Sequence, residues 1–248
     1  MVNILISGAS SGIGAALARV YAAPGTRLIL WGRNGTRLAA IAAETKSRGA
    51  ETAMHCFDLT DTEALLTALE DAELRGPIDI AIFNAGLGGS LPHDAIAQDP
   101  LAAAKMATVN FTAPVIGANF MAERMGARRA GRIVLIGSVA ALFPLPMAPV
   151  YSGSKAGLTM FAEALATRVE RFGVRVSLVS PGFIDTPMSQ GLKEPRPFLI
   201  GADQAAAIIA KRVARGARHI IVPRPFAVIA AVAKIVPGVL VRAVLAWF

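Results

Sequence analysis

Short apolar, β-branched runs alternate with longer amphipathic stretches along most of this chain, and this alternation constrains the fold more than any other feature. The runs are NILIS, RLILW, TAMHCF, IDIAIF, RIVLIGS, VRVSLVS and HIIV. Continuous apolar runs are typical of strands buried on both faces of a parallel sheet. Stretches such as GAALARVYAA between them indicate amphipathic helices. We therefore expect an α/β fold: one doubly wound sheet of seven mainly parallel strands, with helices on both faces.

Composition narrows the class of protein. The chain has 248 residues, of which 54% are hydrophobic, enough for one large domain with a well-buried core. A single cysteine, Cys56, excludes a disulfide framework and a cysteine-based zinc site, and no metal is expected. We expect Cys56 to be a small buried residue at a strand end. The N-terminus has no basic region before its apolar run, so the sequence predicts a cytoplasmic protein without a signal peptide.

The net charge of +8 comes almost entirely from one end of the chain. No Asp or Glu occurs from Gln204 to Phe248, a stretch with seven basic residues: Lys211, Arg212, Arg215, Arg218, Arg224, Lys234 and Arg242. A nucleic-acid-binding protein more often shows a basic face with interleaved aromatic residues. Here the basic residues lie among long apolar runs, so no nucleic-acid partner is expected.

A glycine-rich turn follows the first strand, in SGASSGIG. Gly8, Gly12 and Gly14 let the backbone turn tightly and approach a pyrophosphate, whose charge is favoured by the N-terminus of the next helix. Because the ligand of a doubly wound sheet lies at the carboxyl ends of the strands, we expect a dinucleotide here.

The next three strand ends carry further candidate contacts. The second ends in LWGRN, with Arg33 where an NAD-binding protein usually has an acid, and Arg37 follows one turn later. A guanidinium can pair with a 2′-phosphate, so NADP is favoured over NAD. The alternative is that Arg33 is a solvated residue at a helix start. Asp58 can accept a hydrogen bond from adenine or cap a helix, although Thr60 or Asp61 fits the cap better. The segment 84–86 (NAG) would lie close to the adenosine ribose.

The fifth strand is followed by a candidate proton-transfer group. Ser138 lies at its end, and Tyr151 and Lys155 are one helical turn apart in YSGSK. This spacing is common by chance and indicates little alone. Beside a cofactor, the Lys155 charge would lower the pKa of the Tyr151 phenol from about 10, so that it exchanges a proton near neutral pH. Ser138 would then hold the substrate oxygen.

The ordered set SGASSGIG, NAG, Ser138, YSGSK and PG resembles the short-chain dehydrogenase/reductase family, in its short single-domain branch with a Rossmann-type fold. The resemblance covers residues 2 to about 222. It implies that Tyr151 is the general acid/base, that Lys155 lowers its pKa and binds the nicotinamide ribose, and that Ser138 orients the substrate. Asn110, in TVNF, matches the family's active-site asparagine, which supports a water-mediated proton relay to Lys155. Ser7 replaces the usual Thr, and Gly137 stands where Ser is common.

The resemblance also implies a set of cofactor contacts, in which residues 181 and 182 pass beside the nicotinamide and residue 186 contacts its carboxamide or the phosphate. The residues expected to bind the cofactor are Gly8, Ser10, Ser11, Gly12, Ile13, Gly14, Arg33, Arg37, Asp58, Leu59, Asn84, Ala85, Gly86, Tyr151, Lys155, Pro181, Gly182, Ile184 and Thr186. A homodimer or homotetramer is implied as well.

Two apolar segments are expected to form the substrate pocket. A lid over about Ile184 to Ile200 contains Met188, Leu192, Phe198 and Leu199, and the loop after Ser138 adds LFPLPMAPV. These side chains favour a lipophilic ketone or aldehyde. The alternatives are a polyol or sugar dehydrogenase on the same scaffold and a non-catalytic NADP-binding sensor or scaffold, against which the intact Ser138, Tyr151 and Lys155 argue.

Residues 223–248 form a basic, hydrophobic tail after the catalytic domain of residues 1–222. A spanning helix needs about 20 predominantly apolar residues, and Pro237 and Gly238 divide this stretch into two shorter pieces. We expect two amphipathic helices on the inner membrane surface, with basic residues facing anionic headgroups. The alternatives are that the tail packs across a subunit interface or caps the pocket.

Overall fold

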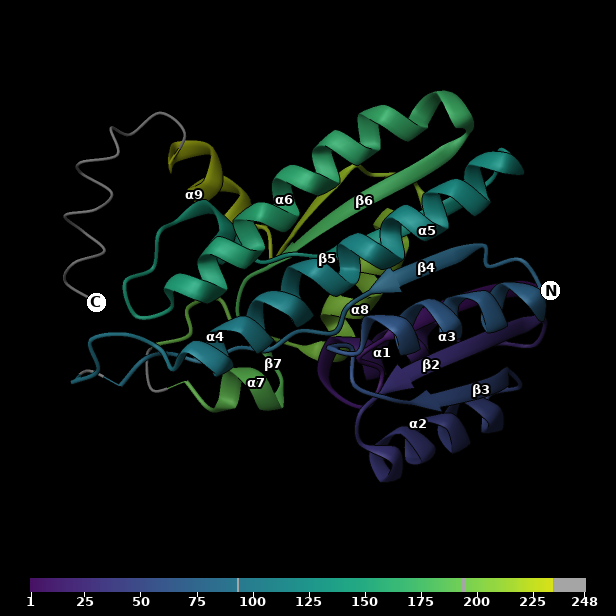
Figure 1. Cartoon of the computed structure of the whole chain (residues 1–248), viewed down its shortest axis with the longest axis horizontal. Coiled ribbons are helices and arrows are strands. Elements are labelled where there is room, and N and C mark those ends of the chain that lie inside the picture. Colours follow the sequence, from purple (N-terminus) through teal and green to yellow (C-terminus); the bar gives the residue numbers. More distant parts are fainter. Residues whose placement is uncertain (93, 193–194, 234–248) are drawn as a thin grey trace.

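The computed structural model describes residues 1–92, 94–192 and 195–233. Within these ranges, seven parallel strands form one sheet in the order β3-β2-β1-β4-β5-β6-β9, which confirms the predicted doubly wound α/β architecture (Figure 1). The strands are β1 (Val2–Ser7), β2 (Thr26–Gly32), β3 (Glu51–Cys56), β4 (Ile80–Phe83), β5 (Gly131–Ile136), β6 (Val174–Pro181) and β9 (His219–Val222). Two short strands that the sequence did not indicate, β7 (Ile184–Asp185) and β8 (Ile200–Gly201), pair with each other beside this sheet.

Helices cover both faces of the sheet (Figure 1). The longer ones are α1 (Gly12–Tyr21), α2 (Gly35–Ser47), α3 (Thr62–Leu74), α4 (Pro100–Ala107), α5 (Ala113–Ala127), α6 (Pro149–Val169), α8 (Ala202–Ala214) and α9 (Pro225–Ala233). Shorter helical turns are η1 (Thr108–Thr112), η2 (Val139–Leu142), η3 (Glu170–Phe172) and α7 (Pro187–Gln190). No helix within the described ranges is long and apolar enough to cross a membrane.

Alternate residues of each strand point to opposite faces of the sheet and pack into two separate hydrophobic cores. On β1, Ile4 and Ile6 pack with α1, α2 and α8, while Leu5 packs with α3, α5 and α6 on the opposite face. Both sides of the central strands are therefore buried, which is the physical reason that their sequences read as unbroken apolar runs.

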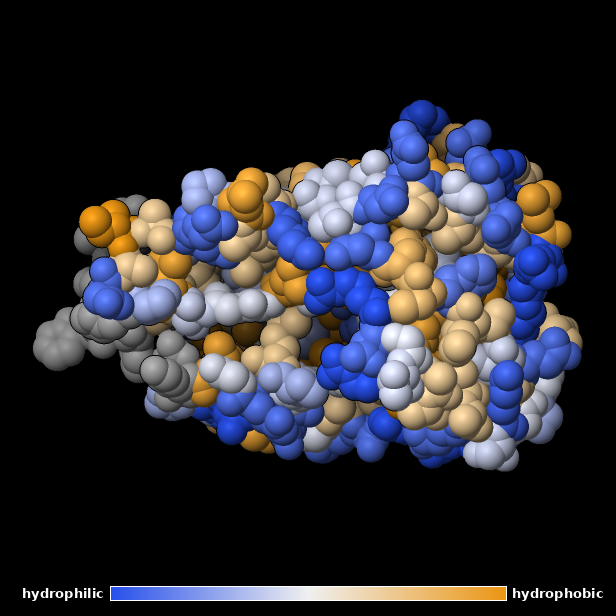
Figure 2. Space-filling model, turned by 60° about the horizontal axis from the view of Figure 1, so that its bottom comes forward, coloured by the Kyte–Doolittle hydropathy of each residue, from blue (hydrophilic) through white to orange (hydrophobic). Residues whose placement is uncertain are grey.

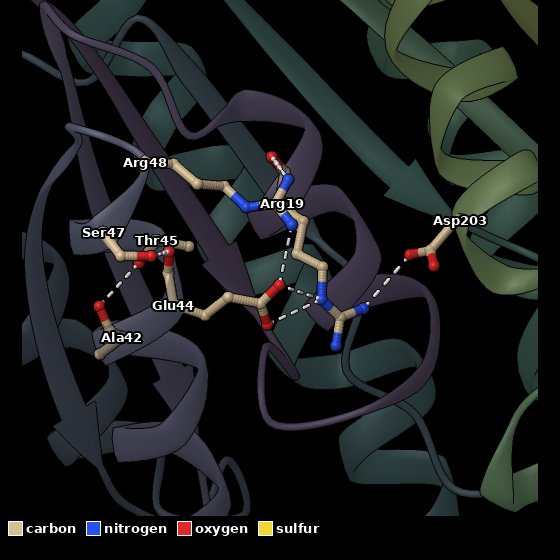
Figure 3. A network of polar contacts seen from close by, with 7 residues as sticks. All are labelled: Arg19, Ala42, Glu44, Thr45, Ser47, Arg48 and Asp203. Carbon is tan, nitrogen blue, oxygen red and sulfur yellow. Dashed lines mark hydrogen bonds and ion pairs between the residues drawn. The ribbon is translucent and has the colours of Figure 1, made fainter.

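A polar network joins the three helices of the first face (Figure 3). Arg19 of α1 lies between Glu44 of α2, at 2.9 Å, and Asp203 of α8, at 3.2 Å. Arg48, just after α2, donates to Glu44 at 2.9 Å. A single exposed ion pair contributes roughly 0–1 kcal/mol, so we read this network as fixing how the helices sit rather than as a major source of stability.

The expectation that Cys56 is buried is wrong. The thiol is exposed, because β3 is the edge strand of the sheet and Cys56 is its last residue. Its Sγ donates a hydrogen bond to the carbonyl oxygen of Arg33 at 3.1 Å.

Candidate active site

The glycine turn joins β1 to α1 and brings the backbone close to the next strand end. Gly8 and Gly12 have φ angles of 68° and 55°, values that other residues rarely adopt. A Cβ atom on Gly14 would lie 2.2 Å from the carbonyl oxygen of Gly8, so only glycine lets α1 pack this tightly. No side chain caps α1 at Ser11, and the first helical turn holds no acid. The free amide groups of this helix start therefore favour a bound phosphate.

Ser7 and Asn84 tie the turn to the end of β4. The Ser7 hydroxyl accepts hydrogen bonds from the backbone amides of Asn84 at 3.0 Å and Ala85 at 3.1 Å. The Asn84 side chain donates to the carbonyl oxygens of Ser7 and Gly8. Ser7 thus supplies a hydroxyl group that holds two backbone amides, as a threonine at this position could also do.

Arg33 and Arg37 line the cavity at the end of β2, and both are exposed. Asn34 caps α2 by accepting a hydrogen bond from the Arg37 amide at 2.9 Å, and Arg33 lies directly before this cap with an exposed side chain, as the alternative of a solvated helix-start residue also predicts. The Arg33 guanidinium lies 3.7 Å from a carboxylate oxygen of Asp58. Two cations, one of them paired with Asp58, therefore line the cavity at this strand end.

Asp58 is held ionised by its neighbours. Burial acts to raise its pKa, but hydrogen bonds from Thr60 and Lys105 outweigh burial and lower the pKa below its usual value. Lys105 of α4 reaches the carboxylate at 3.3 Å, a contact across 47 residues that no sequence signal could have indicated. The helix-cap alternative for Asp58 is wrong, because Asp61 caps α3 through the Ala64 amide.

Asn110 lies on η1, a π-helical turn between α4 and α5. Such turns are rare and often occur at functional sites. The side chain is fully buried, accepts from the Leu87 amide at 2.7 Å, and donates to the Leu87 carbonyl at 2.9 Å and to Ser154 at 3.3 Å. Asn110 does not line the cavity, so its side chain positions the segment after β4.

Ser138, Tyr151 and Lys155 come together on the cavity wall, as the sequence predicted. Ser138 ends the connection from β5, while Tyr151 and Lys155 lie one turn apart on α6. Lys155 is only 4% exposed, and its Nζ donates to the carbonyl oxygen of Ile136 at 2.8 Å. The same nitrogen lies 6.0 Å from the centre of the Tyr151 ring.

The lowering of the Tyr151 pKa beside a bound cofactor stays a prediction, and the protein groups alone have the opposite effect. Burial raises the pKa of the phenol, and hydrogen bonding with Ser138 offsets only part of this effect. Burial also lowers the pKa of Lys155 to about 8. Burial of Lys155 and partial burial of Tyr151 disfavour their charged forms, and the ammonium group donates to the Ile136 carbonyl.

One cavity of about 1100 Å³ joins all these strand ends, and Figure 2 shows a hollowed face with hydrophobic side chains in its depth. Of the predicted site residues, all but Gly14 and Asn110 line it. Its substrate end is apolar, with Phe143, Leu145, Met147, Phe183, Met188, Leu192, Phe226, Val228 and Ile229. Of the four lid residues singled out in the sequence, Met188 and Leu192 line the cavity, while Phe198 and Leu199 do not.

Helix α9 supplies cavity residues that the sequence analysis assigned to a tail. Phe226, Val228 and Ile229 line the same cavity as Tyr151. Helix α9 therefore contributes to the site that the sequence analysis assigned to residues 1–222 alone. The signal that could have found them is the uninterrupted apolar run PFAVIAAVA, which indicates a helix that buries one of its faces. The rest of the predicted tail, residues 234–248, lies outside the described residues. Among the described ones, no group of three His, Cys, Asp or Glu side chains could hold a metal ion.

Comparison with known proteins places this geometry in context. A family model described as short chain dehydrogenase matches residues 2–197. An uncharacterized oxidoreductase of Myxococcus xanthus is 31% identical over 236 residues, which cover 94% of this chain and 92% of that protein. A galactitol 2-dehydrogenase (L-tagatose-forming) of Cereibacter sphaeroides is 34% identical over 196 residues, which cover 78% of this chain and 75% of that protein.

Two solved structures share the fold over most of the chain. A short-chain dehydrogenase from Sphingobium yanoikuyae in complex with NADPH has a TM-score of 0.82 and 27% identity, covering 90% of this chain and 89% of that one. A bulky-bulky ketone specific alcohol dehydrogenase from Comamonas testosteroni has a TM-score of 0.81 and 25% identity, covering 90% of this chain and 86% of that one.

Proposed function

The chain belongs to the short-chain dehydrogenase/reductase family, and from this membership and its site we propose that it is an NADPH-dependent reductase of lipophilic ketones or aldehydes. The coarser part of this function follows directly: the protein is a nucleotide-binding oxidoreductase of this family. The cofactor preference, the direction and the substrate class are the proposal.

The arginines at the end of β2 support NADPH. Arg33 and Arg37 line the cavity beyond the glycine turn, where an acid that would repel a 2′-phosphate is replaced by cations. The Sphingobium yanoikuyae relative was solved with NADPH, which is consistent with this choice. When bound, the nicotinamide would supply the hydride.

The convergence of Ser138, Tyr151 and Lys155 on the cavity wall is the observation that carries the proposed carbonyl reduction, and burial there raises the pKa of the Tyr151 phenol. A phenol that stays protonated near neutral pH is ready to donate a proton to a carbonyl oxygen. Ser138, which shares a hydrogen bond with Tyr151, is placed to hold the same oxygen. Buried Lys155 contributes donors to the cofactor side of the site and a charge that favours electron build-up on oxygen.

The apolar substrate end supports a lipophilic carbonyl compound. Most of the side chains that line the cavity near Ser138, Tyr151 and the lid are aromatic, aliphatic or Met, although Ser90 and Ser189 also line it. The Comamonas testosteroni relative is specific for bulky ketones. A polyol dehydrogenase is the second candidate, favoured by the resemblance to a galactitol dehydrogenase, but a polyol would leave its hydroxyl groups without partners in such a pocket.

The test is NADPH oxidation by the purified protein, followed by absorbance, with ketones, aldehydes and polyols as separate panels. We expect ketone or aldehyde reduction that prefers NADPH over NADH. Tyr151→Phe should lower kcat by roughly 10²–10⁴-fold while NADPH still binds. Tyr21→Phe is the matched control, because Tyr21 does not line the cavity and its hydroxyl group has no hydrogen-bond partner among the described residues. Turnover that survives in Tyr151→Phe would refute the assignment, and oxidation of polyols alone would favour the second candidate.

A further inference from the structure

Helix α9 is fastened to the active site through one aromatic ring. Phe226 is buried, and its ring lies against the backbone of Gly182, where a Cβ atom would come within 2.3 Å of it. Gly182 itself lines the cavity directly after β6. The start of α9 is therefore a fixed part of the cavity wall.

The same ring touches both ends of the lid. Phe183, just before β7, has its ring centre 6.0 Å from that of Phe226, and Phe198, just before β8, has its ring centre at 5.7 Å. Strands β7 and β8 pair through Ile184 and Ile200 and so close the base of the lid. Phe198 has a φ angle of 57°, a left-handed conformation that is uncommon for a bulky residue. The lid and α9 thus share one aromatic cluster, formed by Phe183, Phe198 and Phe226.

Two further residues of α9 extend this wall outward. Ile229 lies three residues after Phe226, on the same helical face, and Val228 lies beside it. Both line the cavity, yet they are 39% and 66% exposed, so they lie where the cavity opens to solvent. Phe226, Val228 and Ile229 therefore give one wall of the cavity that holds Tyr151 an apolar surface, buried at Phe226 and exposed at the other two.

We propose that α9 is a hydrocarbon-binding wall that selects carbonyl substrates with an elongated apolar chain, which lies along Phe226 and ends at Val228 and Ile229. This inference rests on the proposed reductase function and specifies where the apolar part of the substrate binds. A compact or polar substrate would leave the wall uncovered. An elongated chain would cover it and remove its exposed apolar surface from water.

The dependence of kcat/KM on the length of the substrate's carbon chain tests whether α9 binds that chain. The substrates are straight methyl ketones from 2-butanone to 2-decanone, with kcat/KM measured for each. A methylene group that becomes buried should raise kcat/KM by about fourfold. In Val228→Asp and Ile229→Asp, the loss should grow with chain length and flatten the slope, because the added charge lies where only the longer chains reach. Val20→Asp is the matched control: Val20 is a helical valine, 41% exposed, that does not line the cavity, and its slope should equal that of the wild type.

A binding measurement separates this inference from the reductase proposal. Calorimetry with straight secondary alcohols from 2-butanol to 2-octanol, on protein saturated with NADPH, gives the same slope without turnover, because an alcohol cannot accept the hydride of the reduced cofactor. If no ketone is reduced, but alcohol affinity rises with chain length and both variants flatten this rise, the hydrocarbon-binding role of α9 is supported and the reductase proposal fails. If affinity does not depend on chain length, or if the slope persists in both variants, the proposal that α9 binds the hydrocarbon chain is refuted.

Discussion

Lys155 is a buried cation whose cost to the fold can be measured. Its side chain is 4% exposed, and burial lowers its pKa from 10.5 to about 8. In the unfolded chain the pKa returns to its ordinary value, so the unfolded state holds more protons between about pH 8 and pH 10.5. Where the unfolded state binds more protons, stability rises with pH. Lys155 therefore destabilises the fold most at and below pH 7, and this cost shrinks through the window above pH 8.

Lys155→Met removes the titrating group and keeps a side chain of similar length. From the two pKa values, the linkage relation gives a change of about 2 kcal/mol between pH 7 and pH 9.5. The free energy of unfolding of the variant, minus that of the wild type, should be more positive by this amount at pH 7 than at pH 9.5. The variant also loses the hydrogen bond to Ile136, but that loss applies at both pH values and cancels in the comparison.

Urea unfolding of both proteins without nucleotide, followed by circular dichroism, supplies these free energies. Lys211→Met is the control, because Lys211 is exposed on α8 and its variant should show no such pH dependence. A difference for Lys155→Met that changes by less than about 0.5 kcal/mol between the two pH values would refute the reasoning. It would mean that the Lys155 ammonium is solvated well enough to keep an ordinary pKa.

Three further predictions concern the cofactor, the contact of α9 with Gly182, and residues 234–248. Arg33→Ala should lower kcat/KM for NADPH by about tenfold to a hundredfold, because a charged hydrogen bond to phosphate is lost. The value for NADH should stay nearly unchanged, and equal losses for both cofactors in steady-state kinetics would contradict this role of Arg33. Gly182→Ala should destabilise the protein by about 1–3 kcal/mol, because the new methyl group meets the Phe226 ring. Adding Phe226→Leu should restore part of that loss in urea unfolding, and additive losses would argue against the contact. The full-length protein should co-sediment with anionic phosphatidylglycerol vesicles, and replacing Lys234 and Arg242 by Gln should weaken this by about thirtyfold. Equal binding to zwitterionic vesicles would argue against an electrostatic surface contact.

The strands and the main site residues could be predicted because they depend on local pattern and chain order. Each of the seven apolar runs forms a strand within a residue or two of its expected bounds. Parallel strands end at one edge of a sheet, so residues that follow separate strands, such as Arg33, Ser138 and the glycine turn, must meet there. Their convergence needs no knowledge of side-chain packing.

Solvent exposure and electrostatics depend on packing, which the sequence does not show. Cys56 was expected to be buried because cysteine usually is, but strand order places β3 at the sheet edge. The lowering of the Tyr151 pKa was expected beside a bound cofactor and stays a prediction, but spacing along the chain could not show the effect of burial. Burial acts on both groups at once, and the Lys155 ammonium group binds the Ile136 carbonyl.

By itself, the sequence determined the doubly wound sheet, the dinucleotide turn and the Ser138, Tyr151 and Lys155 group, since periodicity and spacing along one chain encode them. Only the tertiary structure decided that Lys105 restrains Asp58 and that Phe226 packs on Gly182. Both contacts join residues more than 40 positions apart, and they depend on how α4 and α9 pack against the rest of the fold. The physical reason is that burial and side-chain contact are properties of the packed whole, whereas hydrophobic periodicity is already present in each segment.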